Sequence, residues 1–146
     1  MIIYMETNNS GVIIADTSGL VSLFSIDDRN HAEAVNAAKR LQNEQRDILI
    51  PAAVLIEFLN VMGRKAGHDI ALAAIAELTP PFLILNEPSH LPTMPAYQKF
   101  AMLPKAVSFT DCIVMAVADD YGTKDIFGFD QQFEDAGYSR LKPSSQ

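Results

Sequence analysis

The stretch Ser108–Asp130 reads SFTDCIVMAVADDYGTKDIFGFD, and its pattern decides the fold. The apolar run Phe109–Tyr121 is long enough for a buried helix, and Gly122 follows it, as glycine often follows a helix. A short apolar strand is expected next at Ile126–Phe129, ending at Asp130. A short strand buried on both faces beside a longer helix is typical of a parallel sheet covered by helices.

The rest of the chain repeats this alternation of short strands and longer helices. Asp27 or Asp28 is expected to cap the second helix, which would run to about Gln45. The alternation predicts an α/β fold, a three-layer α/β/α sandwich around a parallel sheet. The expected strands are 12–15, 48–50, 82–85, 126–129 and 138–141, and the expected helices are 20–25, 27–45, 52–66, 71–78, 96–103, 109–121 and 131–136.

Length and composition limit the class of protein. A chain of 146 residues fits one domain, which we expect at residues 12–142, with a flexible N-terminal tail at 1–11 and a C-terminal tail at 143–146. The single cysteine, Cys112, excludes an internal disulfide and is expected to be a small core residue. No apolar run approaches the roughly 18 residues of a membrane helix, and the first residues lack a secretory signal pattern. We therefore expect a cytoplasmic protein.

Four carboxylates are expected at one edge of the predicted sheet. Asp16 closes the first strand and Asp130 closes the fourth, while Asp111 lies in the first turn of the helix before the fourth strand. Glu57 lies in the second turn of the helix after the second strand. Open parallel sheets bind ligands beyond the carboxyl ends of their strands, so this edge is the expected site.

Each carboxylate also has a structural explanation. Asp16 and Asp130 can cap the helices that follow them, and Asp111 stands three residues after Ser108, as in a capping box. Glu57 shares a helical face with Arg64 and can simply be solvated. Taken together, however, two carboxylates about 5 Å apart repel by about 3 kcal/mol at an effective dielectric constant of about 20. Four of them would raise one another's pKa or require a cation.

A set of oxygen ligands without a histidine or cysteine pattern suits a hard ion, Mg²⁺ or Mn²⁺. Such ions activate water and hold phosphate oxygens during phosphodiester hydrolysis. The net charge of −7 argues against nucleic-acid binding, since nucleic-acid binders are usually basic. Two divalent ions would change it from −7 to −3, because each adds +2. Part of the acidity is then the metal-binding apparatus itself.

These residues carry a family resemblance. The segments Ile14–Ser18, Ser108–Asp111 and Ile126–Phe133, together with the helical Glu57, resemble the PIN domain family, and most closely the VapC-type toxin ribonucleases of type II toxin–antitoxin systems. The resemblance extends from about residue 12 to 141. It implies a metal-dependent endoribonuclease with a parallel sheet of about five strands, in which a metal-activated water attacks the RNA phosphate. It also implies a homodimer and a small antitoxin protein that masks the active site.

Carried over to this sequence, the resemblance implies that Asp16, Glu57, Asp111 and Asp130 hold Mg²⁺ or Mn²⁺. Small hydroxyl residues near the metal fall at Thr17, Ser18 and Thr110; each either orients a carboxylate or a water, or belongs to a turn. The family commonly has serine or threonine two residues before the last acid, where this chain has Gly128.

Basic residues near the expected site are candidate RNA contacts, although each can equally be a solvated charge. They are Arg64, Lys65, Lys99 and Lys105. Other polar residues are expected to lie outside the site: the acids Asp119 and Asp120 at a helix end, and the surface histidines His31, His68 and His90.

Other functions remain open. A non-catalytic PIN-like module that binds RNA or protein would keep the fold but lose an acid. An aspartyl-phosphate phosphotransferase would need a second acid where Ser18 stands, and a receiver-like protein would need a lysine at the end of a late strand. A purely structural α/β protein is the remaining alternative.

Overall fold

The computed structural model describes residues 11–85 and 93–145, so most of the expected N-terminal tail, as well as His90 and Gln146, lies outside the described residues. At its centre is a parallel sheet with the strand order β3-β2-β1-β4. Ile14 of β1 lies opposite Leu49 of β2 on one side and Ile126 of β4 on the other. The strands are β1 (Ile13–Ala15), β2 (Ile48–Ile50), β3 (Phe82–Ile84) and β4 (Ile126–Phe127).

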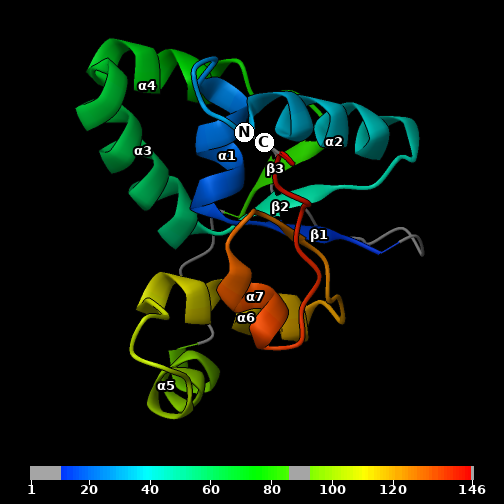
Figure 1. Cartoon of the computed structure of the whole chain (residues 1–146), viewed down its shortest axis with the longest axis vertical. Helices are drawn as coiled ribbons and strands as arrows, with labels where there is room; N and C mark the ends of the chain where they lie inside the picture. The colour runs from blue at the N-terminus through cyan, green and yellow to red at the C-terminus, as the bar shows by residue number, and fades with distance from the viewer. Residues whose placement is uncertain (1–10, 86–92, 146) are drawn as a thin grey trace.

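Helices cover both faces of this sheet, with α1 to α4 on one side and α5 to α7 on the other (Figure 1). The chain builds β1, β2 and β3 in one direction and then crosses back to place β4 on the other side of β1. The three-layer α/β/α prediction is confirmed. The helices are α1 (Thr17–Phe24), α2 (His31–Asn43), α3 (Ala52–Ala66), α4 (His68–Ala76), α5 (Thr93–Met102), α6 (Phe109–Asp120) and α7 (Gln131–Asp135).

The strands form the centre of the core. All residues of β1, β2 and β4 are buried. The side chains of Phe58 in α3 and Phe133 in α7 belong to the same core and have no exposed surface. Cys112 is wholly buried in α6, as predicted. Gly19 lets α1 approach β4, because a Cβ atom there would overlap the Phe127 carbonyl. This close packing fixes the start of α1 against the end of β4. No helix of the described residues is long and apolar enough to cross a membrane.

The C-terminal edge of the sheet differs from the prediction. The described residues form four strands, and the expected strand 138–141 is reduced to one parallel bridge between Asp125 and Ser139. β4 ends at Phe127 instead of Phe129, because the Phe129 N–H donates to the Ser18 hydroxyl and not to a neighbouring strand. The residues after α7 therefore have only a short strand to pair with.

The start of α2 also differs. The helix begins at His31 with Asn30 as its N-cap, and neither Asp27 nor Asp28 caps it. The Asp28 carboxylate instead accepts hydrogen bonds from the Ser22 hydroxyl and the Asn30 N–H, which closes the turn between α1 and α2. His31 is partly buried, contrary to the prediction of a surface residue, because its Nδ1 lies 2.8 Å from the Ser22 carbonyl oxygen.

Candidate active site

Asp16 lies at the carboxyl end of β1 and is 2% exposed. Its N–H donates to the Phe127 carbonyl of β4, and its Oδ2 accepts hydrogen bonds from the Ser18 N–H at 3.2 Å and the Ser18 hydroxyl at 2.9 Å. The carboxylate therefore caps α1, as the structural explanation predicted. Capping engages Oδ2 on the side of Ser18, and Asp16 still lines the cavity described below.

Asp111 is held in the first turn of α6. Ser108 and Asp111 form the predicted capping box, in which the Ser108 N–H donates to Asp111 Oδ2 at 2.9 Å and the Asp111 N–H donates to the Ser108 hydroxyl at 3.1 Å. Asp130 differs, because it occupies the N-cap position of α7 but its side chain makes no capping hydrogen bond. The capping explanation is therefore correct for Asp111 and wrong for Asp130.

These three aspartates converge. One carboxylate oxygen from each of Asp16, Asp111 and Asp130 lies within 4.8 Å of the other two. The carboxylates belong to the residue after β1, to α6 and to the loop after β4, where the chain reverses its direction across the sheet. This is the position at which open α/β sheets bind ligands.

The electrostatics of the cluster favour a proton or a cation. Burial, together with the charges of Asp130 and Asp111, raises the pKa of Asp16 to about 7. Burial also raises the pKa of Asp130, with the charges of Asp111 and Glu57 adding to it and Arg140 opposing it. The ion pairs of Arg46, Lys99 and Arg140 go to other acids. Protonation or a bound cation would relieve this mutual repulsion.

The residues present fit a hard divalent ion. All donors of the cluster are carboxylate oxygens, which Mg²⁺ and Mn²⁺ prefer. The buried hydroxyl of Thr17 has no hydrogen-bond partner among the described residues, and Thr17 lines the same cavity as the three aspartates. A buried hydroxyl without a partner is costly, so its position beside Asp16 is consistent with a water or ligand in the cavity.

The cavity has a volume of about 400 Å³ and extends from the aspartates across α1 and α3. Glu57 lines its wall from α3 but is not one of the three converging carboxylates. Of the predicted hydroxyl residues, Thr17 and Ser18 line the cavity, whereas Thr110 is partly buried and is not part of the lining. The sequence predicted that four carboxylates lie at one edge of the sheet. The structure brings three of them within 4.8 Å of one another and places Glu57 on the wall of the same cavity.

The glycine at position 128, where the family commonly has serine or threonine, is explained by lack of space. A Cβ atom at this position would lie 2.8 Å from the Asp16 Cβ and 3.2 Å from the Ser18 hydroxyl oxygen. The space that a serine or threonine side chain would need at residue 128 is thus taken by Asp16 and Ser18. The hydroxyl beside Asp16 comes from Ser18 on α1.

The cations near the site are not those that the sequence singled out. Arg64, Lys65 and Lys105 are exposed and do not line the cavity, and Lys99 forms an ion pair with Asp119 at 2.8 Å. The candidate role of Lys99 as an RNA contact stays a prediction, and its ion pair with Asp119 argues against it. Arg29 lines the cavity from the turn before α2, where sequence periodicity offers no signal. The prediction that Asp119 lies outside the site is confirmed.

Comparison with known proteins agrees with this geometry. Residues 13–137 match the PIN domain family, and the chain therefore belongs to that family, as the resemblance predicted. Among solved structures, the chain is similar to VapC20 of Mycobacterium tuberculosis, which is described as a toxin that cleaves the sarcin–ricin loop. The two chains share 26% sequence identity and superpose with a TM-score of 0.72, over 90% of this chain and 99% of VapC20. No curated protein matches the chain.

Proposed function

We propose that the chain is a divalent-metal-dependent endoribonuclease that hydrolyses RNA phosphodiester bonds and acts as the toxin of a toxin–antitoxin pair. The observation that carries this proposal is the convergence of Asp16, Asp111 and Asp130 at the carboxyl ends of β1 and β4. Membership of the PIN domain family and similarity to a toxin that cleaves RNA support it.

In this function Asp16, Asp111 and Asp130 would hold Mg²⁺ or Mn²⁺, and Glu57 would complete the site from the cavity wall. A bound divalent ion supplies Lewis-acid chemistry, which activates water and neutralises phosphate charge. The role of the chain is to hold the carboxylates: Ser18 orients Asp16 and Ser108 orients Asp111. In-line hydrolysis in which the 3′-oxygen leaves would give a 5′-phosphate product.

One cation, Arg29 in the turn before α2, stands at the wall of the cavity that the substrate would enter. Arg29 lines the cavity together with the aspartates, so we assign it, in addition to Arg64, Lys65 and Lys105, as a contact for RNA phosphates. The chain is acidic overall, with a net charge of −7, so long-range steering of RNA should be weak. Local cations and the metal must then supply most of the attraction for RNA.

The alternative functions have less support. A non-catalytic PIN-like module would keep the fold but lose an acid, and here all four acids line one cavity. An aspartyl-phosphate enzyme would need a second acid two residues after Asp16, where Ser18 stands and hydrogen-bonds the carboxylate. A receiver would need a lysine, and the described lining of the cavity holds none.

The proposed partners are an RNA substrate, a small antitoxin protein and a second copy of the chain, in the cytoplasm. Similarity to a VapC toxin supports the first two. A short reading frame for a DNA-binding protein beside the gene, whose product co-purifies with this chain, would support the antitoxin. Light scattering of the purified chain would give the mass expected of a dimer, and the mass of a 16.0 kDa monomer would contradict the homodimer.

The enzymatic proposal is tested by incubating the purified chain with RNA, including a sarcin–ricin loop oligonucleotide, in Mg²⁺, in Mn²⁺ and in excess chelator. We expect cleavage only with the metals, and none by Asp111→Asn. The side-chain oxygen of the introduced asparagine can still accept the hydrogen bond from the Ser108 N–H, so the fold should be kept. Asp120→Asn, at the exposed other end of α6, is the matched control. Cleavage in chelator would contradict the metal mechanism, and unchanged cleavage by Asp111→Asn would contradict the site.

A further inference from the structure

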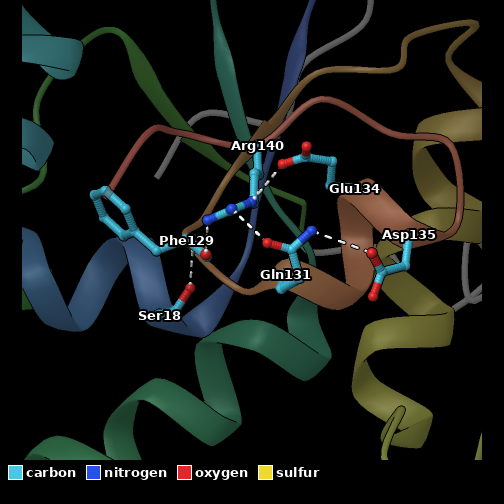
Figure 2. Close-up of polar contacts among 6 residues, drawn as sticks. All are labelled: Ser18, Phe129, Gln131, Glu134, Asp135 and Arg140. Carbon is cyan, nitrogen blue, oxygen red and sulfur yellow. Dashed lines mark hydrogen bonds and ion pairs between the residues drawn. The ribbon is translucent and has the colours of Figure 1, made fainter. Parts of the chain in front are cut away.

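Arg140, in the segment after α7, is fixed by three contacts. Its Nε donates to Glu134 Oε2 at 2.8 Å, its Nη1 to the Phe129 carbonyl oxygen at 2.7 Å and its Nη2 to Gln131 Oε1 at 2.7 Å (Figure 2). Its side chain is 12% exposed. All three guanidinium nitrogens thus donate to protein acceptors. These contacts favour a structural role for Arg140 over binding of an RNA phosphate.

The backbone of Phe129 is held at both of its flanking peptide groups. Its N–H donates to the Ser18 hydroxyl at 2.9 Å, and its carbonyl accepts from Arg140. Figure 2 shows Ser18 and Arg140 on opposite sides of Phe129. The same Ser18 hydroxyl donates to Asp16 Oδ2 at 2.9 Å. Hydrogen bonds therefore connect Asp16 to Arg140 by way of Ser18 and the backbone of Phe129, the residue that precedes Asp130.

Arg140 also holds the first turn of α7, through Gln131 and Glu134. An aspartate at a helix N-cap ordinarily uses its carboxylate to accept a backbone N–H of the first turn. Asp130 occupies that position without making such a bond. Arg140 stabilises the start of α7 through Gln131 and Glu134, where an N-cap side chain would ordinarily do so. The Asp130 carboxylate is therefore available to the cluster.

We propose that Arg140 is a positioning residue that sets the geometry of the divalent-ion site, by clamping the Phe129–Asp130 peptide so that Asp130 meets Asp16 and Asp111. This role rests on the proposed function, because it presumes that the cluster binds a metal. It predicts that the fork of three donors matters, and not the positive charge alone. Lysine has the charge but cannot reach three divergent acceptors from one planar group.

Arg46 provides a matched control. Its Nη2 donates to Asp125 Oδ2 at 2.7 Å and its Nε to the Gly11 carbonyl at 3.2 Å, and its side chain is 21% exposed. These contacts join the residues just before β1 and β4, at the opposite ends of the strands from the carboxylate cluster. Arg46→Gln therefore removes a comparable arginine contact without touching the site.

The test compares Mn²⁺ binding by calorimetry, RNA cleavage kinetics and unfolding by denaturant for the full chain and for Arg140→Gln, Arg140→Lys and Arg46→Gln. We expect both Arg140 variants to bind Mn²⁺ about 10- to 100-fold more weakly, the range seen when the support of a metal ligand is lost. When the RNA concentration is varied at a fixed metal concentration, their kcat should fall more than their KM rises. Arg46→Gln should lower the denaturant midpoint of unfolding about as much as the Arg140 variants do. Its Mn²⁺ affinity should stay within about twofold of that of the unsubstituted chain.

Arg140→Lys is the milder substitution and decides the test if Arg140→Gln does not fold. Unchanged Mn²⁺ affinity in the Arg140 variants, or an equal loss in Arg46→Gln, would overturn the role of Arg140 while leaving the proposed function standing. Failure of the unsubstituted chain to bind Mn²⁺ would instead overturn the proposed function, and the role of Arg140 with it.

Discussion

The two ends of helix α6 carry aspartates in opposite environments. At the N-terminal end, Asp111 is one of three carboxylates whose oxygens lie within 4.8 Å of one another. At the C-terminal end, Asp119 accepts a hydrogen bond from the Tyr138 hydroxyl at 2.7 Å and forms an ion pair with Lys99 at 2.8 Å. A carboxylate with partners of this kind contributes to structure. Carboxylates that face one another are costly unless a ligand compensates them, so this arrangement indicates a site.

The pKa values at the two ends move in opposite directions. Burial tends to raise the pKa of Asp119, but the hydrogen bonds from Lys99 and Tyr138 and the charges of Lys99 and Lys124 outweigh it and lower the pKa. In the cluster, burial and the neighbouring acids both raise the pKa of Asp16, to about 7. The same residue type is thus stabilised as an anion at one end of the helix and destabilised as an anion at the other.

The largest expected effect is on catalysis. Asp130→Asn should reduce RNA cleavage by more than about a hundredfold, since even the loss of a group that only supports a metal ligand costs about 10- to 100-fold. Asp119→Asn, the same change at the paired end of α6, should leave cleavage within about twofold. Cleavage rates under single-turnover conditions measure both. A similar loss in the two variants would show that the contrast between the ends of α6 has no functional meaning.

The next effect is on stability as a function of pH, without metal. Because the pKa of Asp16 is about 7 when folded and 3.8 in its unperturbed form, the folded chain holds this proton more tightly. Its contribution to stability is therefore fully present below about pH 4 and is lost as the pH rises to about 7, by about 1.4 kcal/mol per pH unit.

Asp16→Asn removes this titration, and asparagine can still cap α1. We therefore expect the variant to gain stability relative to the unsubstituted chain between about pH 4 and 7, in denaturant titrations with chelator. The contribution of Asp119 depends on pH in the opposite direction, because its lowered pKa gives stability that is lost as the pH falls. A pH-independent difference between Asp16→Asn and the unsubstituted chain would contradict the environment assigned to Asp16.

The smallest effect is expected at Lys99. Lys99→Met should lower the free energy of unfolding by no more than about 1 kcal/mol, because the pair with Asp119 is partly exposed and Tyr138 still binds the carboxylate. The KM for RNA should not change, since Lys99 is committed to Asp119. Kinetics with RNA and equilibrium unfolding check both statements, and a raised KM would restore Lys99 as an RNA contact.

Local patterns were enough to predict the layers of the fold and the position of the acids. The apolar runs of β1, β2 and α6 have the length and burial that their composition predicts, and Asp16 and Asp130 follow strands as expected. The capping box at Ser108 and Asp111 was also readable, because its two hydrogen bonds depend only on spacing along one helix.

What the sequence could not predict depends on contacts between distant segments. β4 stops early because Phe129 turns its N–H to Ser18, which lies 111 residues away in the chain. Lys99 looked like a free cation until the structure placed α5 beside the end of α6. No sequence motif pointed to Arg140, because its contacts arise from the packing of the C-terminal segment beside β4 and α7.

The central claim is that the facing carboxylates, and not the paired ones, bind a divalent ion. It is tested most directly by calorimetric titration of Mn²⁺ into the metal-free chain, Asp111→Asn and Asp119→Asn. We predict binding to the unsubstituted chain and to Asp119→Asn with affinities within about twofold, and binding at least about tenfold weaker to Asp111→Asn. Equal affinity in all three, or no binding to the unsubstituted chain, would contradict the account.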